Sequence, residues 1–282
     1  MAVSEELKAL VAQVPDPDDQ GMFTRNIDKD KIEKAVAAIF EGGRGNVQGL
    51  IEMLGEPGST EDARPHYALH CALNRALVLR DEKARRQFCE ALAANLSGNL
   101  SPYNKAYLCQ ELQWAGRKEA VPALGKLLTD EHLCDPAGMA LAAIGDGAVQ
   151  ELVAALPRAG GRCRLVVAHT LAALGDAQSA GALMQLLNDT DPEVRLAAGA
   201  GLAKIGDARA AGALLKAADI AQGWERIQAT KHCLILAERL MAVGNRPQAV
   251  IVYRQLRDTR RDASERYVRD AAEKALAAVR GG

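Results

Sequence analysis

One short pattern returns along the chain and decides what it can fold into. Leu-Ala, any residue, and then Ile or Leu precede each of Gly145-Asp146, Gly175-Asp176 and Gly206-Asp207. The glycines of these copies lie 30 and 31 residues apart. A repeat of this length is typical of stacked helix pairs, in which each pair packs only against its neighbours. We therefore predict an all-α fold, an α-α superhelix of about seven helix pairs, without β-strands.

The repeated glycine marks the turn between the two helices of a pair. Glycine tolerates the left-handed conformation of a helix C-cap, and an Asp after it can cap the next helix. Asp191-Pro192 and Ser101-Pro102 are typical starts of a first helix. Weaker copies extend the series, with Arg80 in place of a glycine. The predicted turns lie at positions 43, 80, 116, 145, 175, 206 and 244.

The strength of the pattern varies along the chain. We expect one solenoid over residues 1–282, with degenerate N-terminal capping repeats at 1–100 and regular repeats at 101–218. The helices at 219–282 resemble tetratricopeptide helices, and we predict that they cap the C-terminal end. Four leucines should be buried between neighbouring repeats: Leu183, Leu187, Leu202 and Leu214.

The most complete copy carries a family resemblance. The segment Asp191-Pro-Glu-Val-Arg-Leu-Ala-Ala-Gly-Ala-Gly-Leu-Ala-Lys-Ile-Gly-Asp207 resembles the HEAT repeats of the phycobilisome (bilin) lyase type, and the match is best over 160–218. The resemblance implies a HEAT-repeat solenoid whose second helices line the concave face. It also implies an alternative function, a bilin-lyase-like or chaperone-like subunit that acts on a chromoprotein. Because this fold hosts many unrelated tasks, the resemblance is specific for architecture and not for activity.

The cysteines and the chain start bear on the compartment. Six cysteines show no Cys-x-x-Cys spacing and fall on apolar helix faces, so we expect them to be buried and unpaired. Unpaired thiols favour a reducing compartment such as the cytoplasm, although a removed signal peptide stays open. The first residues lack the basic and apolar regions of a signal peptide, and no apolar stretch approaches transmembrane length.

Candidate catalytic and metal-binding motifs are sparse. His66 and His70 would share one helix face beside Cys71, but no third ligand stands at matching spacing. The chain has no His-Glu dipeptide, which excludes the di-iron hydroxylases built on helical repeats. We therefore expect no metal, no cofactor and no catalytic residue.

The overall charge argues against nucleic acid. The formal net charge is −1, and the middle of the chain is nearly neutral. Trp114 and Trp224 stand near repeat boundaries, where we expect their rings to pack between helices. Because phosphate neutralisation normally dominates nucleic-acid binding, we do not expect a nucleic-acid partner.

Charge is nevertheless distributed unevenly along the chain. Residues 1–62 carry six basic and thirteen acidic side chains, whereas residues 220–282 carry twelve basic and seven acidic ones. Aligning the second helices gives one exposed column, which changes from acidic to basic along the array: Glu52, Glu90, Lys126, Ala154, Gln185, Lys216 and Arg254. We predict that this column binds a protein partner and permits weak head-to-tail self-association at low salt.

Arginines form two further groups. Arg164 and Arg195, with Lys105 at the equivalent place, should bridge neighbouring repeats through capping acids such as Asp176 and Asp191. The C-terminal basic patch is either a solvated helix face or a second docking surface: Arg257, Arg260, Arg261, Arg266 and Arg269. Together these features predict a non-enzymatic scaffold or adaptor that binds another protein along the concave face of the solenoid.

Overall fold

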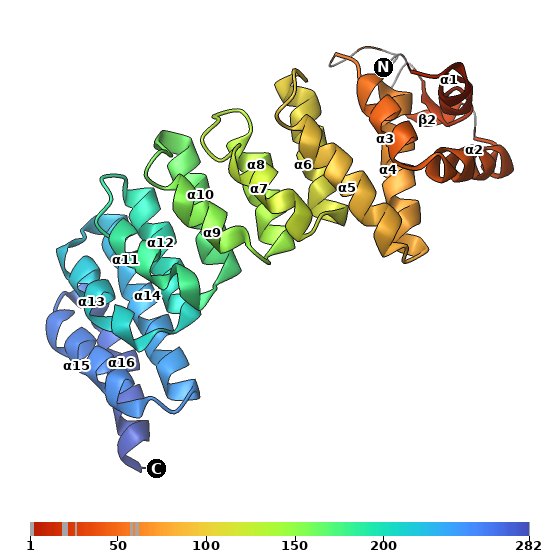
Figure 1. Ribbon diagram of the computed structural model, residues 1–282. Coiled ribbons are helices and arrows are strands. Elements are labelled where there is room, and N and C mark those ends of the chain that lie inside the picture. The colour runs from red at the N-terminus through yellow and green to blue at the C-terminus, as the bar shows by residue number, and fades with distance from the viewer. Residues whose placement is uncertain (1–2, 19–21, 26, 57–58, 60–61, 282) are drawn as a thin grey trace. The chain divides into compact units, whose positions relative to one another are not determined.

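The computed structural model describes residues 3–18, 22–25, 27–56, 59 and 62–281. These residues form sixteen α-helices and a single pair of short strands (Figure 1). The predicted fold class, an all-α helical-repeat solenoid, is therefore confirmed. The chain divides into two compact units, Met1–Glu151 and Leu152–Gly282, which we call unit 1 and unit 2. None of the described helices combines the length and apolar character needed to cross a bilayer.

Unit 1 begins with a helix and a hairpin and continues as helix pairs. Its elements are α1 (Glu5–Val11), β1 (Asp16–Pro17), β2 (Phe23–Arg25), α2 (Lys29–Glu41), α3 (Gly43–Glu52), α4 (Ala63–Val78), α5 (Glu82–Asn95), α6 (Pro102–Ala115), the 3-10 turn η1 (Lys118–Ala120), α7 (Val121–Gly125) and α8 (Cys134–Ile144). Helix α9 (Ala148–Ala155) spans the boundary between the units.

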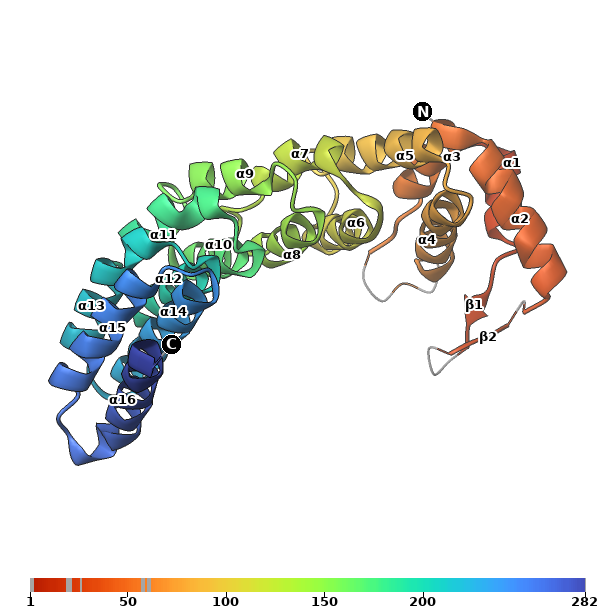
Figure 2. The ribbon, with the colours of Figure 1, turned by 90° about the horizontal axis from the view of Figure 1, so that it is seen from below.

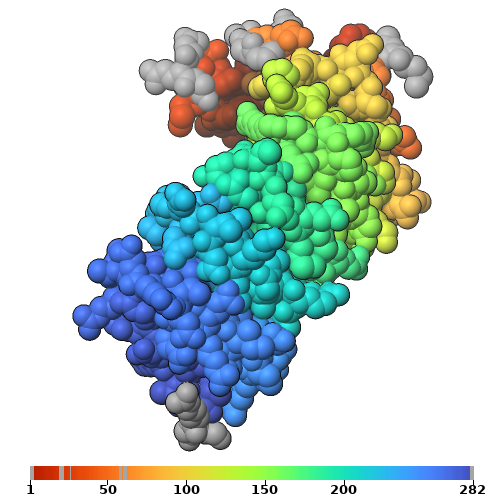
Figure 3. All heavy atoms as spheres, turned by 90° about the vertical axis from the view of Figure 1, so that its left-hand side faces the viewer, coloured from red at the N-terminus to blue at the C-terminus, as the bar shows by residue number. Residues whose placement is uncertain are grey.

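Unit 2 contains the most regular repeats. Its elements are α10 (Gly161–Leu174), η2 (Ala177–Ser179), α11 (Ala180–Leu186), α12 (Pro192–Ile205), η3 (Ala208–Ala210), α13 (Ala211–Ile220), α14 (Gly223–Ala242), α15 (Arg246–Thr259), η4 (Ala263–Glu265) and α16 (Arg266–Gly281). In the space-filling view its residues form a continuous surface that runs from green to blue (Figure 3).

The expectation of no strands is wrong for the N-terminal region. Strands β1 and β2 form a small antiparallel ladder that pairs Asp16 with Arg25 and Pro17 with Phe23. The Asp18 side chain accepts hydrogen bonds from the backbone amide of Met22 and the hydroxyl of Thr24, which holds the two arms together. Strands of two and three residues carry too little alternation to be recognised from a sequence pattern.

The predicted turns match the backbone at six of seven positions. Residues 43, 80, 145, 175, 206 and 244 all have positive φ angles. Among the described residues Arg80 is the one non-glycine in this conformation, with φ of 55°, as expected for a repeat that lost its glycine. Gly116 differs, because its φ of −69° and ψ of 154° are extended and end α6 without a left-handed cap.

The helices of unit 2 form two layers (Figure 2). First helices α10, α12 and α14 pack along one another more extensively than α13 packs along α15. A close approach of α12 to α10 explains the tight spacing: a Cβ at Gly201 would lie 2.9 Å from the Cα of Ala172. The first helices consequently line the inner side of the bend within unit 2, and α11, α13 and α15 form its outer layer (Figure 2). This arrangement is the reverse of the expected one, in which second helices line the concave face.

Apolar side chains between the layers form the core. All four predicted leucines, Leu183, Leu187, Leu202 and Leu214, are buried. Gly181 and Gly212 on the second helices behave differently from Gly201, because a Cβ at either position would meet nothing within 4 Å. Close helix packing therefore depends on glycine in the first-helix layer and not in the second.

We predict opposite effects for two Gly→Ala changes in unit 2. Gly201→Ala should destabilise the protein by about 1–3 kcal/mol, because its methyl group would collide with the α10 backbone. Gly212→Ala, the control, should stabilise α13 by up to about 1 kcal/mol through helix propensity alone. Urea unfolding of both variants measures the difference, and equal stabilities would contradict the close approach of α10 and α12.

A second prediction concerns His232, which is buried on α14 against Gly199 of α12. Burial, assisted by the neighbouring charge of Lys231, lowers the pKa of His232 from 6.5 to about 4. Because the unfolded chain takes up this proton first, stability should fall as the pH drops from about 6.5 to about 4, by about 1–3 kcal/mol. His232→Leu should remove this part of the pH dependence in melts at pH 7 and pH 5. An unchanged slope in the variant would show that the pKa of His232 is the same in the folded and unfolded states.

Candidate binding surfaces

The structure places the predicted charged column on the surface. In unit 1, Glu52 and Lys126 are exposed, and Glu90 is half-buried and paired with Arg86 at 2.9 Å. In unit 2, Ala154, Gln185, Lys216 and Arg254 are exposed. Gln185, Lys216 and Arg254 lie on α11, α13 and α15, which are the outer layer of that unit. Whether these residues bind a partner stays a prediction.

Three arginines form a regular ladder through unit 2. Arg164, Arg195 and Arg226 lie 31 residues apart on α10, α12 and α14. Each guanidinium donates hydrogen bonds to backbone carbonyls near the end of the preceding second helix. Arg164 donates to Leu156, Arg195 to Asp189 and Thr190, and Arg226 to Ala218 and Asp219. Each also binds a carboxylate further along the chain, on Asp189, Glu225 and Glu265 respectively.

The predicted bridging between repeats is present, but through other acids. Asp176 and Asp191 instead cap the N-termini of η2 and α12 with their side chains. Lys105, in unit 1, makes no ion pair with another described residue. Sequence reasoning missed Arg226, which the 31-residue spacing from Arg195 would have identified.

The strongest pair of the ladder joins Arg195 to Glu225. Nε and Nη2 of Arg195 donate to the two carboxylate oxygens of Glu225 at 2.6 and 2.7 Å. These hydrogen bonds raise the pKa of Arg195. Asp189 accepts the ion pair from Arg164. Burial opposes the ionisation of Asp189, but hydrogen bonds from the Asp191 amide and the Arg164 guanidinium outweigh this effect and lower the pKa of its carboxyl group.

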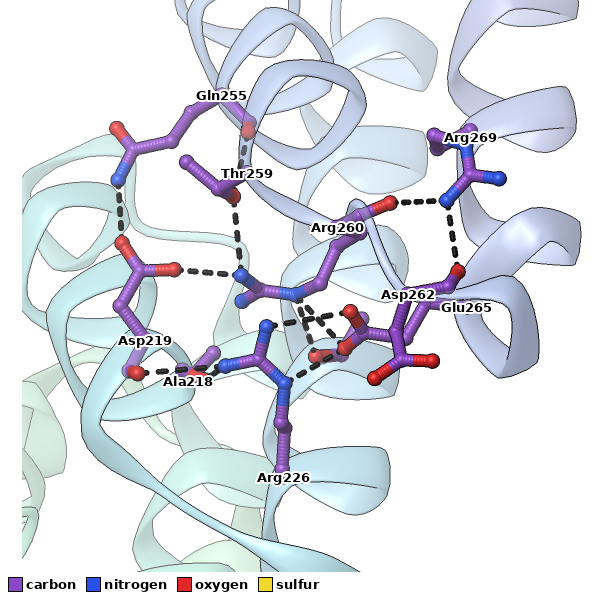
Figure 4. A network of polar contacts seen from close by, with 10 residues as sticks. Ala218, Asp219, Arg226, Gln255, Thr259, Arg260, Asp262, Glu265 and Arg269 are labelled. Carbon is purple, nitrogen blue, oxygen red and sulfur yellow. Dashed lines mark hydrogen bonds and ion pairs between the residues drawn. The ribbon is translucent and has the colours of Figure 1, made fainter.

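The C-terminal basic patch is only partly a surface feature. Arg260 is fully buried and donates to the Asp219 carboxylate at 2.6 Å and to the Thr230 hydroxyl at 3.1 Å (Figure 4). Arg269 donates to the carbonyls of Arg260 and Asp262 (Figure 4). The inclusion of Arg260 in a docking surface is therefore wrong, because its guanidinium holds α13, α14 and the α15–α16 connection together.

The remaining arginines of the patch face outward to different extents. Arg261 and Arg266 are exposed, and Arg266 lies 3.5 Å from Asp270 one helical turn away. Arg257 is half-buried and pairs with Asp258 at 2.7 Å. The structure thus leaves two arginines of the five well placed to meet a partner.

A cleft in unit 2 gathers exposed apolar side chains. It has a volume of about 650 Å³ and lies between the α13–α14 connection, α14 and the start of α16. Ile220, Ile227 and Tyr267 line the cleft, and all three side chains are exposed to solvent. Its polar lining includes the cations Arg226 and Arg261 and the acids Asp219, Asp262 and Glu265.

Both tryptophans are also exposed, which corrects the expectation that they pack between helices. Trp224 is 66% exposed and stands one helical turn from Ile227 on α14. Trp114 is 64% exposed near the end of α6. Each repeat of a solenoid packs only against the repeats before and after it. A large ring at the edge of a first helix can therefore face solvent.

The thiols are mostly buried, and the two histidines of α4 lie beside carboxylates. Five cysteines are buried and Cys71 is half-buried, and burial raises the pKa of Cys89, Cys109 and Cys233 to about 12. His66 and His70 each face a carboxylate, on Asp62 and Glu111. Within the described ranges no group of three or more His, Cys, Asp or Glu side chains is arranged to hold a metal ion.

Comparison with protein families identifies the repeats of unit 2. The family model described as HEAT repeats matches residues 149–235. This segment consists of HEAT repeats. It contains all three arginines of the ladder, and the prediction of a HEAT-repeat solenoid is confirmed where the sequence pattern is strongest. No curated protein matches the chain in sequence.

Several solved structures are similar over most of the chain. An engineered protein shares 20% identity with a TM-score of 0.47, over 98% of this chain and 78% of its own. The complex of CpcE and CpcF of phycocyanin lyase from Nostoc sp. PCC7120 shares 21% identity with a TM-score of 0.34, over 88% and 92%. Computationally designed armadillo repeat proteins for modular peptide recognition share 19% identity with a TM-score of 0.30, over 96% and 99%. At these identities we take no functional argument from them.

The ladder generates a testable energetic prediction. In a double-mutant cycle with Arg195→Met and Glu225→Gln, the two side chains should be coupled by about 1–2 kcal/mol, because the pair is bidentate and largely shielded from solvent. Arg195→Lys should lose most of this coupling, since an ammonium cannot form the two parallel hydrogen bonds. The exposed pair of Arg209 and Asp207 is the control and should show little coupling. Equal coupling in both cycles would mean that the HEAT ladder stabilises no more than a surface ion pair.

Proposed function

We propose that this protein is a non-enzymatic scaffold that binds another protein along the first-helix face of unit 2. The observation that carries the proposal is the cleft lined by Ile220, Ile227 and Tyr267, with Trp224 one turn away. Large aromatic and aliphatic side chains exposed together and rimmed by arginine are the composition of protein-binding hot spots. Scattered single apolar residues would not need such an explanation, but a group of four around one cleft does.

The rigidity of the site supports the same function. One rung of the ladder, the pair of Arg226 and Glu265, lines the cleft directly. The buried guanidinium of Arg260 ties the elements behind it together. A surface held in this way needs little reordering on binding, which lowers the entropic cost of association.

The charged column has a different part in the proposal. Lys216 and Arg254 lie on α13 and α15 and do not line the cleft, so their part is long-range attraction of the partner. Charges outside the buried core of an interface mainly change the association rate and its salt dependence.

The proposal predicts how binding responds to substitutions. Once the partner is isolated from the native host by pull-down and mass spectrometry, Ile227→Asp and Tyr267→Ala should each weaken its binding about tenfold or more. Reversing Lys216 and Arg254 to Glu should change the salt dependence and leave the affinity at 0.5 M salt unaltered, because charges are screened there over roughly a few ångströms. If the column variant abolishes binding at high salt while the cleft variants bind normally, the partner docks on the outer layer.

A further inference from the structure

A second cleft, in unit 1, is unusual for this chain in its composition. It has a volume of about 480 Å³ and lies between the hairpin, α4 and α6. Four aromatic side chains line it, although aromatic residues make up only 4% of the sequence. We call it the Tyr103 pocket, defined by Phe23, Tyr67, Tyr103 and Tyr107 with the acids Asp62 and Glu111.

The four rings come from the hairpin, α4 and α6. Phe23 packs on Tyr67 with ring centroids 5.6 Å apart, and the Tyr107 ring packs edge-on against His66 at 4.1 Å. Tyr103 is 46% exposed and lies 5.8 Å from the His66 ring. Aromatic faces carry partial negative charge, so a cavity between them attracts cations.

The two acidic residues of the pocket are more deeply buried than the other described acidic residues. Among the described residues, Asp62 and Glu111 are the two acidic side chains in the buried class, and both line this one pocket. Two other shielded carboxylates are paired with arginine, Glu119 with Arg85 and Asp189 with Arg164. No described lysine or arginine lines the Tyr103 pocket. Two buried carboxylates here therefore lack a permanently charged partner.

Each of the two buried carboxylates contacts a histidine, Asp62 with His66 and Glu111 with His70. His66 Nδ1 lies 3.0 Å from Asp62 Oδ1 and 2.7 Å from the Asp62 carbonyl oxygen, so this nitrogen carries the proton. His70 Nδ1 lies 3.1 and 3.2 Å from the two oxygens of Glu111. With Nδ1 protonated, Nε2 of His66 is a hydrogen-bond acceptor, and it is buried without a partner. A polar atom left unpaired in this way is costly unless something else completes the site.

We infer that the Tyr103 pocket binds a lysine side chain, unmodified or methylated, of a protein partner. The inference rests on the proposed function only in that the lysine belongs to a bound protein. Aromatic walls and two buried carboxylates together select a cation over an anion or a neutral apolar group. Lysine is favoured over arginine because each carboxylate already bonds to a histidine and cannot offer both oxygens to a guanidinium fork.

The experiment is an NMR titration of the full chain, read on the histidine and aromatic side-chain signals. The probes are Nα-acetyl-Nε-trimethyllysine methylamide, the unmethylated lysine analogue, and the neutral norleucine analogue. The two cationic probes should shift the signals of His66 and Tyr107 in a saturable way, and norleucine should not. Glu111→Gln should weaken the binding of the cationic probes about tenfold, and Tyr103→Ala about threefold or more, through loss of charge and of one aromatic face.

Matched variants separate this site from that of unit 2. Tyr267→Ala removes a tyrosine that is 56% exposed in the other cleft and should leave probe binding unchanged. If Glu111→Gln does not fold, Tyr103→Ala alone tests the pocket, because that ring is half exposed. Equal binding of norleucine would overturn the inference, as would the absence of any shift with the two lysine probes. Loss of partner binding in Ile227→Asp with normal probe binding would instead bear on the proposed function alone.

Discussion

The ion pairs of Arg164, Arg195 and Arg226 set the spacing on which the rest of unit 2 depends. Each guanidinium satisfies carbonyls that a helix C-terminus leaves free, and each binds a carboxylate that lies 25, 30 or 39 residues further along the chain. Each arginine side chain thus connects the end of one helix to an acidic residue further along the chain. Because arginine offers five donors in a rigid plane, it can make both contacts at once, which lysine cannot.

Small residues allow the first helices of unit 2 to pack closely. The ladder holds α10, α12 and α14 at a constant interval, and Gly201 against Ala172 lets the first two approach closely. Close packing in one layer bends unit 2 toward that layer (Figure 2). The exposed side chains of Trp224, Ile227 and Tyr267 lie on α14 and α16, and Ile220 ends α13. The outer layer carries the neutral Gln185 and the charged Lys216 and Arg254.

The sequence predicted the repeat architecture because the turn between helices has a local chemical cause. A left-handed residue is needed there, so glycine recurs, and even Arg80 could be placed from the register of its neighbours. Side-chain direction was harder to predict. Nothing in the sequence around Arg260 distinguishes it from Arg261, yet one is fully buried and the other is exposed. The partners Glu225 and Glu265 depend on contacts 30 and 39 residues away. Similarly, the Tyr103 pocket combines residues of the hairpin, α4 and α6, which no single motif connects.

The central claim, that a protein partner docks on the first-helix face of unit 2, can be tested by photo-crosslinking in the native host. A photoreactive amino acid placed at position 227, or at position 185 on the outer layer, reports which side the partner touches without altering the charge of the chain. We expect a specific cross-linked species from position 227 and none from position 185. A cross-link formed only from position 185 would contradict the account and assign binding to the outer layer.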